Sequence, residues 1–181
     1  MLSLLLIFKG LNMNKNNGFT LIELMTTLVI STSLVSIVVP NFHSLYEHYR
    51  ADSSIRVIQQ TLQLARNTAI NYGVRVTVCP VIKNKCSHDW SIGITVFIDS
   101  GASNIIDNQD EILFKTASFY HGDFVTYNRT AIRFQADGLA SGTNGTLKYC
   151  PSSILSEYSK AVIINQSGRI RFSKADTIEC S

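Results

Sequence analysis

The chain has 181 residues, of which 45% are hydrophobic, and a formal net charge of +3 at pH 7. About 110 residues follow its one long apolar stretch, which is enough for a single folded core but too few for two domains. A charge excess of three is small for a dedicated nucleic-acid-binding domain, so net charge alone assigns no function.

Residues 1–18 precede the apolar stretch and carry Lys9 and Lys15 after a short apolar run. They match neither the basic start nor the small-residue cleavage site of a standard secretory signal. Residues 13–18 alone would form a compact basic leader, so we expect translation to begin at Met13. Lysine-bearing flanks stay in the cytoplasm, which places everything after Val39 outside it.

Residues 19–39 form an apolar run of 21 residues in which Glu23 is the only charged side chain. A helix of this length spans about 32 Å, which matches the core of a bilayer. We therefore predict a transmembrane helix over 19–39. A carboxylate in such a helix costs at least about 2.5 kcal/mol, so Glu23 is expected to have a function and a cationic partner.

The helical pattern changes after Pro40, a residue that can bend a helix by removing one backbone donor. Apolar residues then recur every three or four positions, with polar residues on the opposite side, which predicts an amphipathic helix over 40–72. Gly73 is suited to a left-handed C-terminal cap. The predicted apolar face consists of Ile55, Ile58, Leu62, Ala65 and Ala69.

From residue 74 onward the apolar period falls to two, which predicts a β-rich head over 73–181. A long helix followed by antiparallel strands is an α+β architecture. The strands are predicted at 74–78, 92–98, 131–134, 146–149 and 161–164, with weaker signals at 111–119 and 124–127.

Four cysteines lie in the exported part of the chain, and an even number of cysteines in an oxidising compartment predicts disulfides. Three pairings are possible, and we favour Cys79 with Cys86 and Cys150 with Cys180. The first would close a short loop that contains two lysines, and the second would fasten the C-terminus to the head. Zinc is the alternative, but the chain has no CxxC spacing and its histidines are scattered, so no metal is predicted.

The sequence Gly18-Phe19-Thr20-Leu21-Ile22-Glu23 resembles the prepilin cleavage motif of type IV pilins and type II secretion pseudopilins. The resemblance implies that prepilin peptidase cuts after Gly18 and that the new N-terminus at Phe19 is methylated. It also implies that Glu23 meets the Phe19 ammonium of a neighbouring subunit during filament assembly. That ammonium would supply the cation that Glu23 requires.

The head resembles the GspH/FimT group of minor pilins and pseudopilins through segments 62–70, 76–80, 90–99, 133–138 and 167–171. This resemblance implies a type IV pilin-like fold, other pilins or pseudopilins as partners, and a single-pass protein of the bacterial inner membrane. The head would lie in the periplasm or on an extracellular filament. Cys180 departs from the family pattern, so its pairing cannot be transferred.

Gly168-Arg169-Ile170-Arg171 is the segment that bears on function within this group. Residues two apart in a strand share a face, so Arg169 and Arg171 would project together while Gly168 forms a turn and Ile170 points into the core. With Lys174, the two guanidinium groups could grip the phosphates of double-stranded DNA without reading its sequence. The FimT side of the family implies DNA capture in natural transformation through such a GRxR element.

Charge is distributed unevenly along the head, with a net +3 over residues 129–181 and a net −5 over residues 88–124. The first value is compatible with DNA binding. The alternative is that the two arginines form an ordinary solvated face and that the chain is a GspH-type pseudopilin of type II protein secretion without DNA binding.

The acidic stretch over 99–111 raises the possibility of calcium binding, but its spacing does not fit the EF-hand loop, and a polar connection between strands is favoured. The four histidines have no companion Ser or Cys in a nucleophile motif, and no glycine-rich loop could cradle a phosphate. The sequence therefore predicts no catalytic residue and no cofactor.

Overall fold

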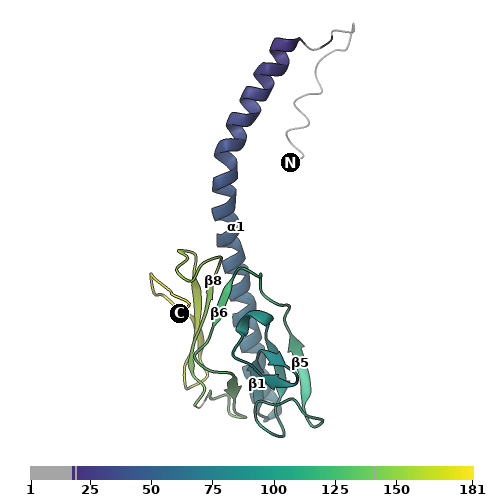
Figure 1. The fold of residues 1–181 in the computed structure, drawn as a ribbon. Helices are drawn as coiled ribbons and strands as arrows, with labels where there is room; N and C mark the ends of the chain where they lie inside the picture. The colour runs from purple at the N-terminus through teal and green to yellow at the C-terminus, as the bar shows by residue number, and fades with distance from the viewer. Residues whose placement is uncertain (1–17, 19, 141) are drawn as a thin grey trace. The chain divides into compact units, whose positions relative to one another are not determined.

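The computed structural model describes residues 18, 20–140 and 142–181. It divides into two compact units, one ending at Phe42 and the other running from His43 to Ser181. Helix α1 (Leu21–Tyr72) has 52 residues and contributes to both units (Figure 1).

In the first unit, the start of α1 is capped by Thr20. The Thr20 hydroxyl accepts a hydrogen bond from the backbone N–H of Glu23 at 3.3 Å, and its carbonyl accepts one from the N–H of Leu24 at 3.1 Å. Thr20 and Glu23 have the spacing of a capping box, and the carboxylate of Glu23 lies at the positive end of the helix dipole. Local helix energetics therefore favour both residues.

The surface of α1 in this unit is apolar, and its hydroxyl groups are bonded internally. Leu21, Ile22 and Leu28 are each more than half exposed, as are most other large side chains before Phe42. The hydroxyls donate to carbonyls three or four residues earlier, so they present few free donors; they belong to Thr26, Thr27, Thr32, Ser33 and Ser36.

Among the residues that were described, no helix combines the length and apolarity needed to cross a bilayer. The membrane segment predicted over 19–39 begins at Phe19, which lies outside the described residues, and it stays a prediction.

In the second unit, the predicted apolar stripe of α1 is confirmed. Ile58, Leu62, Ala65 and Ala69 are fully buried and Ile55 is 3% exposed. The helix ends at Tyr72, followed by Gly73 with φ +64°, and the N–H of Val74 bonds to the carbonyl of Ala69 at 3.2 Å. Gly73 thus forms the predicted left-handed cap.

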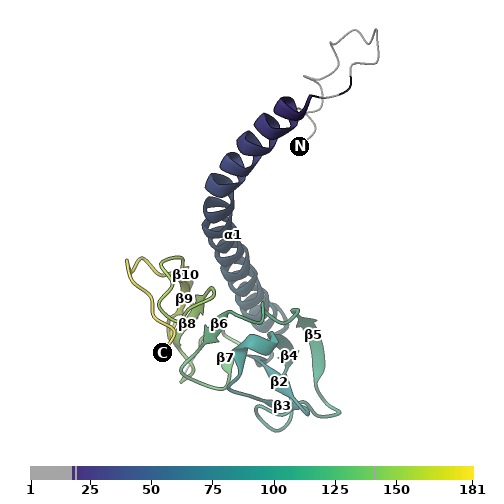
Figure 2. The same ribbon diagram turned by 45° about the horizontal axis from the view of Figure 1, so that its top comes forward.

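The strands of the head form two four-stranded antiparallel sheets and a short hairpin (Figure 2). The first sheet has the order β5-β4-β1-β7, formed by Glu111–Lys115, Thr95–Ile98, Val76–Cys79 and Ile132–Phe134. The second has the order β10-β9-β8-β6, formed by Ile170–Phe172, Lys160–Ile164, Gly145–Cys150 and Phe124–Thr126. The hairpin joins β2 (Val81–Ile82) to β3 (Lys85–Cys86).

All seven predicted strands appear in the structure, although some are shorter than predicted. The strand predicted over 92–98 starts only at Thr95, because Trp90–Ile92 form the 3-10 helix η1. Asp89 caps η1 by accepting from the N–H of Ser91 at 3.1 Å, and Gly93 follows with φ +105°. The β2–β3 hairpin was not predicted, since two-residue strands have no readable periodicity.

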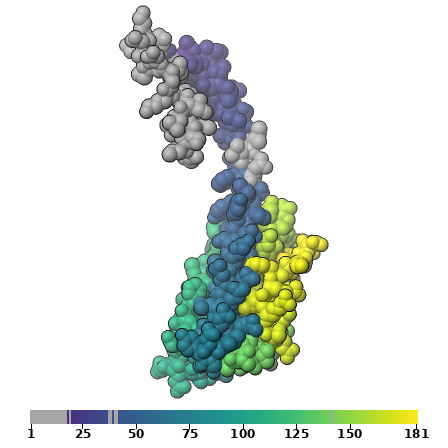
Figure 3. Space-filling model, turned by 180° about the vertical axis from the view of Figure 1, so that it is seen from behind, coloured from purple at the N-terminus to yellow at the C-terminus, as the bar shows by residue number. Residues whose placement is uncertain are grey.

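One continuous core joins the helix to both sheets. Val78 and Val96 of the first sheet and Leu147 and Val162 of the second are all fully buried with the α1 stripe. Figure 3 shows this part of α1 in blue, flanked by teal strands on one side and by the yellow C-terminal segment on the other. Burying one Leu or Ile side chain stabilises a fold by about 1.5–3 kcal/mol, so this stripe holds the two sheets together.

A buried ion pair fixes the helix against the second sheet. Arg50 Nη2 lies 2.8 Å from Asp123 Oδ1 and 2.9 Å from the hydroxyl of Ser152. The Tyr149 hydroxyl donates to the other carboxylate oxygen of Asp123. The guanidinium of Arg50 also stacks over the rings of Tyr46 and Tyr120, with distances of 5.1 and 4.4 Å to the ring centroids.

This environment shifts two pKa values upward. Burial, followed by the hydrogen bond to Asp123, raises the pKa of Tyr149 from 10.0 to about 12. For Arg50, burial is the largest single effect and lowers the pKa, but the attraction of the Asp123 carboxylate and the interactions with Tyr46 and Tyr149 together outweigh it, so the pKa is raised. Both shifts favour the protonation states that bond to Asp123 at neutral pH.

We predict that Tyr149→Phe lowers the free energy of unfolding by about 1–3 kcal/mol at pH 7, because Asp123 loses a buried donor. The raised pKa of Tyr149 gives stability that is complete below pH 10 and is lost as the pH rises through about 12. The variant should therefore lose less stability over that interval. Urea denaturation at several pH values measures both effects.

Tyr158→Phe is the control for loss of a tyrosine hydroxyl, since no hydrogen bond from the Tyr158 hydroxyl is seen in the described part of the head. Equal stabilities of Tyr149→Phe and the unaltered protein would contradict the assigned role of this hydroxyl.

Candidate nucleic-acid interface

The GRxR segment lies at the turn between β9 and β10. The N–H of Asn165 bonds to the carbonyl of Arg169 at 3.0 Å, and the N–H of Gly168 bonds to the carbonyl of Asn165 at 2.9 Å. Gly168 has φ +72°, a left-handed conformation that favours glycine. Gly168 therefore forms the turn that the sequence predicted.

The side chains after this turn alternate as predicted. Arg169 and Arg171 are exposed, whereas Ile170 is half-buried and packs on the main core. Lys174 is also exposed. Within the described residues, none of these three basic side chains makes an ion pair or hydrogen bond, so their charges are available to a ligand.

The position of β10 makes this segment accessible. β10 is an edge strand and pairs only with β9 in its sheet, with Ile170 opposite Ile164 and Arg171 opposite Ile163. Arg171 therefore projects from a strand with one free edge, and the backbone there stays open to solvent or to a partner.

A contact not foreseen from the sequence positions the turn. Arg66 of α1 donates from Nε to the carbonyl of Gly138 at 3.2 Å and from Nη2 to the carbonyl of Ser167 at 3.4 Å. The N–H of Ala140 bonds to the carbonyl of Gln166 at 3.0 Å. Helix α1, the turn after β7 and the GRxR turn are thus joined at one point.

This junction leaves no space for a side chain on Gly168. A Cβ there would overlap the carbonyl oxygen of Gly138 and would lie 2.8 Å from Arg66 Nε. Gly168 is therefore required both for its φ angle and for the close approach of two turns. The sequence placed Arg66 on the polar side of its helix but gave no signal that it bonds to distant carbonyls.

We predict that Gly168→Ala lowers the free energy of unfolding by more than Gly142→Ala. Both glycines have φ +72°, but a Cβ on Gly142 meets no atom within 4 Å. Gly142→Ala should cost about 1–2 kcal/mol for the left-handed conformation alone, and Gly168→Ala should cost clearly more. Chemical denaturation of the two variants makes the comparison, and equal losses would contradict the crowding at Gly168.

The predicted processing and assembly residues lie at the start of the described chain. Gly18 is exposed, and Phe19 lies outside the described residues. Glu23 is exposed, and its carboxylate has no partner within the described residues. The structure thus leaves Glu23 free to meet a cation from another molecule, and the Thr20 cap accounts for only its backbone N–H.

Both favoured disulfides are present, Cys79 with Cys86 and Cys150 with Cys180.

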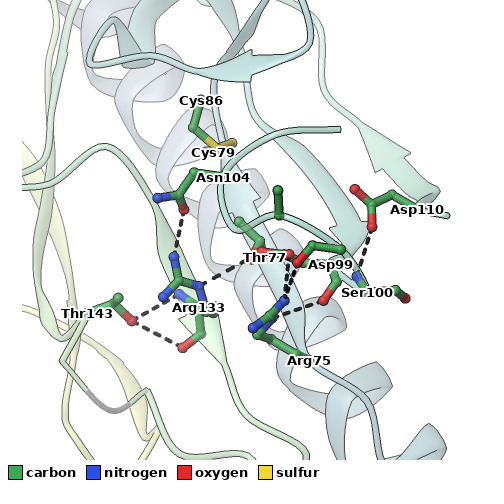
Figure 4. Close-up of polar contacts among 12 residues, drawn as sticks. Arg75, Thr77, Cys79, Cys86, Asp99, Ser100, Asn104, Asp110, Arg133 and Thr143 are labelled. Atoms are coloured by element: carbon green, nitrogen blue, oxygen red, sulfur yellow. Dashed lines mark hydrogen bonds and ion pairs between the residues drawn. A yellow bond between two sulfur atoms is a disulfide. The ribbon is translucent and has the colours of Figure 1, made fainter. Parts of the chain in front are cut away.

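Near the first disulfide, a network of buried charges links the strands of the first sheet (Figure 4). Asp99 Oδ1 accepts from Arg75 Nη2 at 2.9 Å, and Asp99 Oδ2 accepts from the Thr77 hydroxyl at 2.6 Å. Arg133 Nε lies 3.9 Å from the same carboxylate.

The acidic stretch over 99–111 is organised around backbone donors. Asp110 Oδ1 accepts from the N–H of Ser100 at 2.8 Å, and Asp107 Oδ1 accepts from the N–H of Gln109 at 2.8 Å. These carboxylates stabilise a connection between strands, the reading that the sequence favoured over calcium. No cluster of potential metal ligands occurs among the residues that could be searched.

A long N-terminal helix packed on antiparallel strands is the architecture of type IV pilin-like proteins. The model for the prokaryotic N-terminal methylation motif matches residues 13–39, and the model for the type II transport protein GspH matches residues 54–168. The chain belongs to the GspH family.

Solved structures show the same fold. Two crystal forms of the type IV minor pilin FimU of Pseudomonas aeruginosa match with TM-scores of 0.59 and 0.56 and 19% sequence identity. They cover 76% and 72% of this chain and 99% of the FimU chain in each case. Comparison with curated protein sequences gives no match.

These findings confirm the predicted family and fold. The chain is a minor pilin or pseudopilin of a type IV pilus or a type II secretion system. Membership of this family implies processing by prepilin peptidase and assembly with other pilins.

Proposed function

We propose that this minor pilin or pseudopilin is FimT-like and binds the backbone of double-stranded DNA during natural transformation. Arg169 and Arg171 would contact the phosphates, assisted by Lys174. The observation that carries the proposal is the exposure of these side chains, without partners in the described residues, after a turn held by Gly168.

The chemistry of these groups suits a DNA backbone. A guanidinium group can donate two parallel hydrogen bonds to phosphate oxygens, whereas an ammonium group acts as a point charge. Contacts of this kind position a protein on DNA without specifying a sequence. They suit a protein that takes up DNA of any sequence.

Rigidity at the turn supports the same proposal. The side chain of Arg66 and the backbone hydrogen bond between Ala140 and Gln166 hold the turn that directly precedes Arg169. A fixed turn lowers the entropy that Arg169 loses when it binds, so more of the contact energy appears as affinity. Several subunits in a filament would add avidity to a modest individual affinity.

At the N-terminal end, we propose that Glu23 pairs with the methylated ammonium of Phe19 on a neighbouring subunit. The support is the free carboxylate of Glu23 and the apolar surface of α1 before Phe42. We also propose that this segment anchors the precursor in the bacterial inner membrane before assembly. The internally bonded hydroxyls of α1 suit an apolar environment, because they require no water.

The second candidate function is that of a GspH-type pseudopilin in type II protein secretion without DNA binding. The description of the matched family as a type II transport protein favours it. On that alternative, Arg169 and Arg171 form a solvated surface, and the head contacts other pseudopilins.

We predict that Arg169→Gln together with Arg171→Gln lowers the affinity for a double-stranded DNA fragment at least tenfold at low salt. The slope of log affinity against log salt should fall by about 1.8, because two phosphate contacts are lost. Fluorescence anisotropy with the full chain in nonionic detergent and a labelled duplex measures both quantities.

Two controls sharpen this experiment. Replacing both arginines by lysine keeps the charge and should give an intermediate affinity, since bidentate contacts are lost. Lys115→Gln removes one exposed charge from β5 in the other sheet and should change the affinity less than twofold. Full binding by the double Gln variant would favour the secretion alternative.

We predict that the protein isolated from its native host begins at Phe19 and carries an N-terminal methyl group. Intact-mass and tandem mass spectrometry of the N-terminal peptide measure this directly. A Gly18→Glu variant should retain its leader if prepilin peptidase cuts after Gly18. A native N-terminus upstream of Phe19 would contradict both the processing and the proposed pairing of Glu23.

A further inference from the structure

The β2–β3 hairpin displays two lysines on a rigid support far from the GRxR segment in sequence. Lys83 and Lys85 are both exposed, and the disulfide between Cys79 and Cys86 closes the loop that contains them. The N–H of Ile106 bonds to the carbonyl of Asn84 at 2.8 Å. The hairpin is thus held covalently at its base and by hydrogen bonding at its tip.

The turn of this hairpin has an unfavourable backbone conformation. Lys83 has φ +48° and Asn84 has φ +62°, as a two-residue turn of the I′ kind requires. Asparagine tolerates this region, but lysine is an uncommon choice, and residues held in such conformations cluster at functional sites. The fold places a lysine where turn preferences alone would not.

The hairpin adjoins a second group of basic residues. Asn104 connects them, because its carbonyl accepts from the N–H of Cys86 at 2.9 Å and its side-chain oxygen accepts from Arg133 Nη2 at 2.8 Å. Figure 4 shows Asn104 between the disulfide and Arg133. Arg133 lines a surface depression together with His88, Asn104, Arg129, Thr130 and Thr143.

Two guanidinium groups line this depression. The guanidinium of Arg133 is half-buried and is fixed by Asn104 and by Asp99, whose Oδ2 lies 3.9 Å from Arg133 Nε. The backbone of Arg129 is fixed because Trp90 Nε1 donates to its carbonyl at 3.1 Å, while the Arg129 side chain is exposed. One guanidinium is thus held in place beside another that is exposed to solvent.

Two carboxylates lie near this surface, of which one is buried and one exposed. Asp99 is 2% exposed and is already bonded to Arg75 and Thr77, in addition to its long contact with Arg133. Asp89 accepts hydrogen bonds from the N–H and hydroxyl of Ser91. We define the hairpin surface as Lys83, Lys85, His88, Arg129 and Arg133. Its lysines and arginines carry four positive charges, against the exposed carboxylate of Asp89 and the buried carboxylate of Asp99 that Arg133 shares with Arg75.

We propose that the hairpin surface is a second binding surface for the DNA phosphate backbone. The inference rests on the proposed function, which assigns DNA binding to the GRxR segment alone. Ammonium and guanidinium groups contact successive phosphates, and the hydroxyls of Thr130 and Thr143 line the same depression as additional donors.

The two surfaces lie on different parts of the head. β10 is an edge of the second sheet, whereas β2 and β3 form a separate hairpin beside the first sheet (Figure 2). A head with two phosphate-binding surfaces would bind a long duplex with higher avidity than a head with one. Two separate basic surfaces would thus allow the chain to bind DNA although its net charge is only +3.

The test uses the full chain in nonionic detergent and the labelled duplex used for the GRxR segment. Lys83→Gln together with Lys85→Gln should lower the affinity about tenfold at low salt and the salt slope by about 1.8. Arg129→Gln should lower the slope by about 0.9. Lys83→Arg together with Lys85→Arg keeps the charge and should restore most of the affinity.

Circular dichroism and a free-thiol assay confirm that each variant is folded and that its cysteines are paired. Additive losses when these changes are combined with the Arg169 and Arg171 substitutions would support two separate surfaces. Unchanged binding by the hairpin variants, with a loss only in the GRxR variant, would overturn this inference and leave the proposed function intact.

The reverse pattern distinguishes the two proposals. A loss only in the hairpin variants would support the hairpin surface and overturn the role of the GRxR segment. If the unaltered protein binds no DNA at low salt, both proposals are wrong.

Discussion

The head depends on the burial of one stripe of helix α1 between two sheets. Each sheet has only four strands and needs a second layer to cover its apolar face, and the helix supplies that layer for both. Alanines at 51, 65 and 69 allow close approach near the ends of the stripe, while Ile58 and Leu62 fill its middle. A polar residue in this stripe would separate both sheets from their common support.

Buried ion pairs add orientation to this apolar contact. Arg50 with Asp123 relates the helix to the second sheet, and Arg75 with Asp99 joins the start of β1 to the end of β4 within the first sheet. Such pairs contribute little net stability, because desolvation of the charges offsets much of their attraction. Their geometry nevertheless excludes alternative arrangements, since a shifted helix would leave a carboxylate buried without its partner.

Much of the fold could be predicted because its signals are local. The Gly18–Glu23 motif, the stripe ending at Ala69 and the alternation around Arg171 each lie within a few turns or one strand. The predicted pairing of Cys150 with Cys180 also matches the structure, although sequence alone left three pairings open. The β2–β3 hairpin was missed because its two-residue strands show no periodicity. The role of Arg66 was missed because it depends on residues far apart in the chain. Arg66 reaches a carbonyl 72 positions away, and no local pattern encodes that contact.

The disulfide at the C-terminus makes the position of Lys174 depend on whether the surroundings are oxidising or reducing. Residues after Phe172 have no regular secondary structure, and Cys180 joins them covalently to the end of β8. Lys174 lies within the loop that this bond closes. A thiol pair in a reducing compartment leaves that loop open, whereas oxidation closes it. If the protein is exported as proposed, the position of Lys174 relative to β8 would therefore be fixed only after the disulfide has formed.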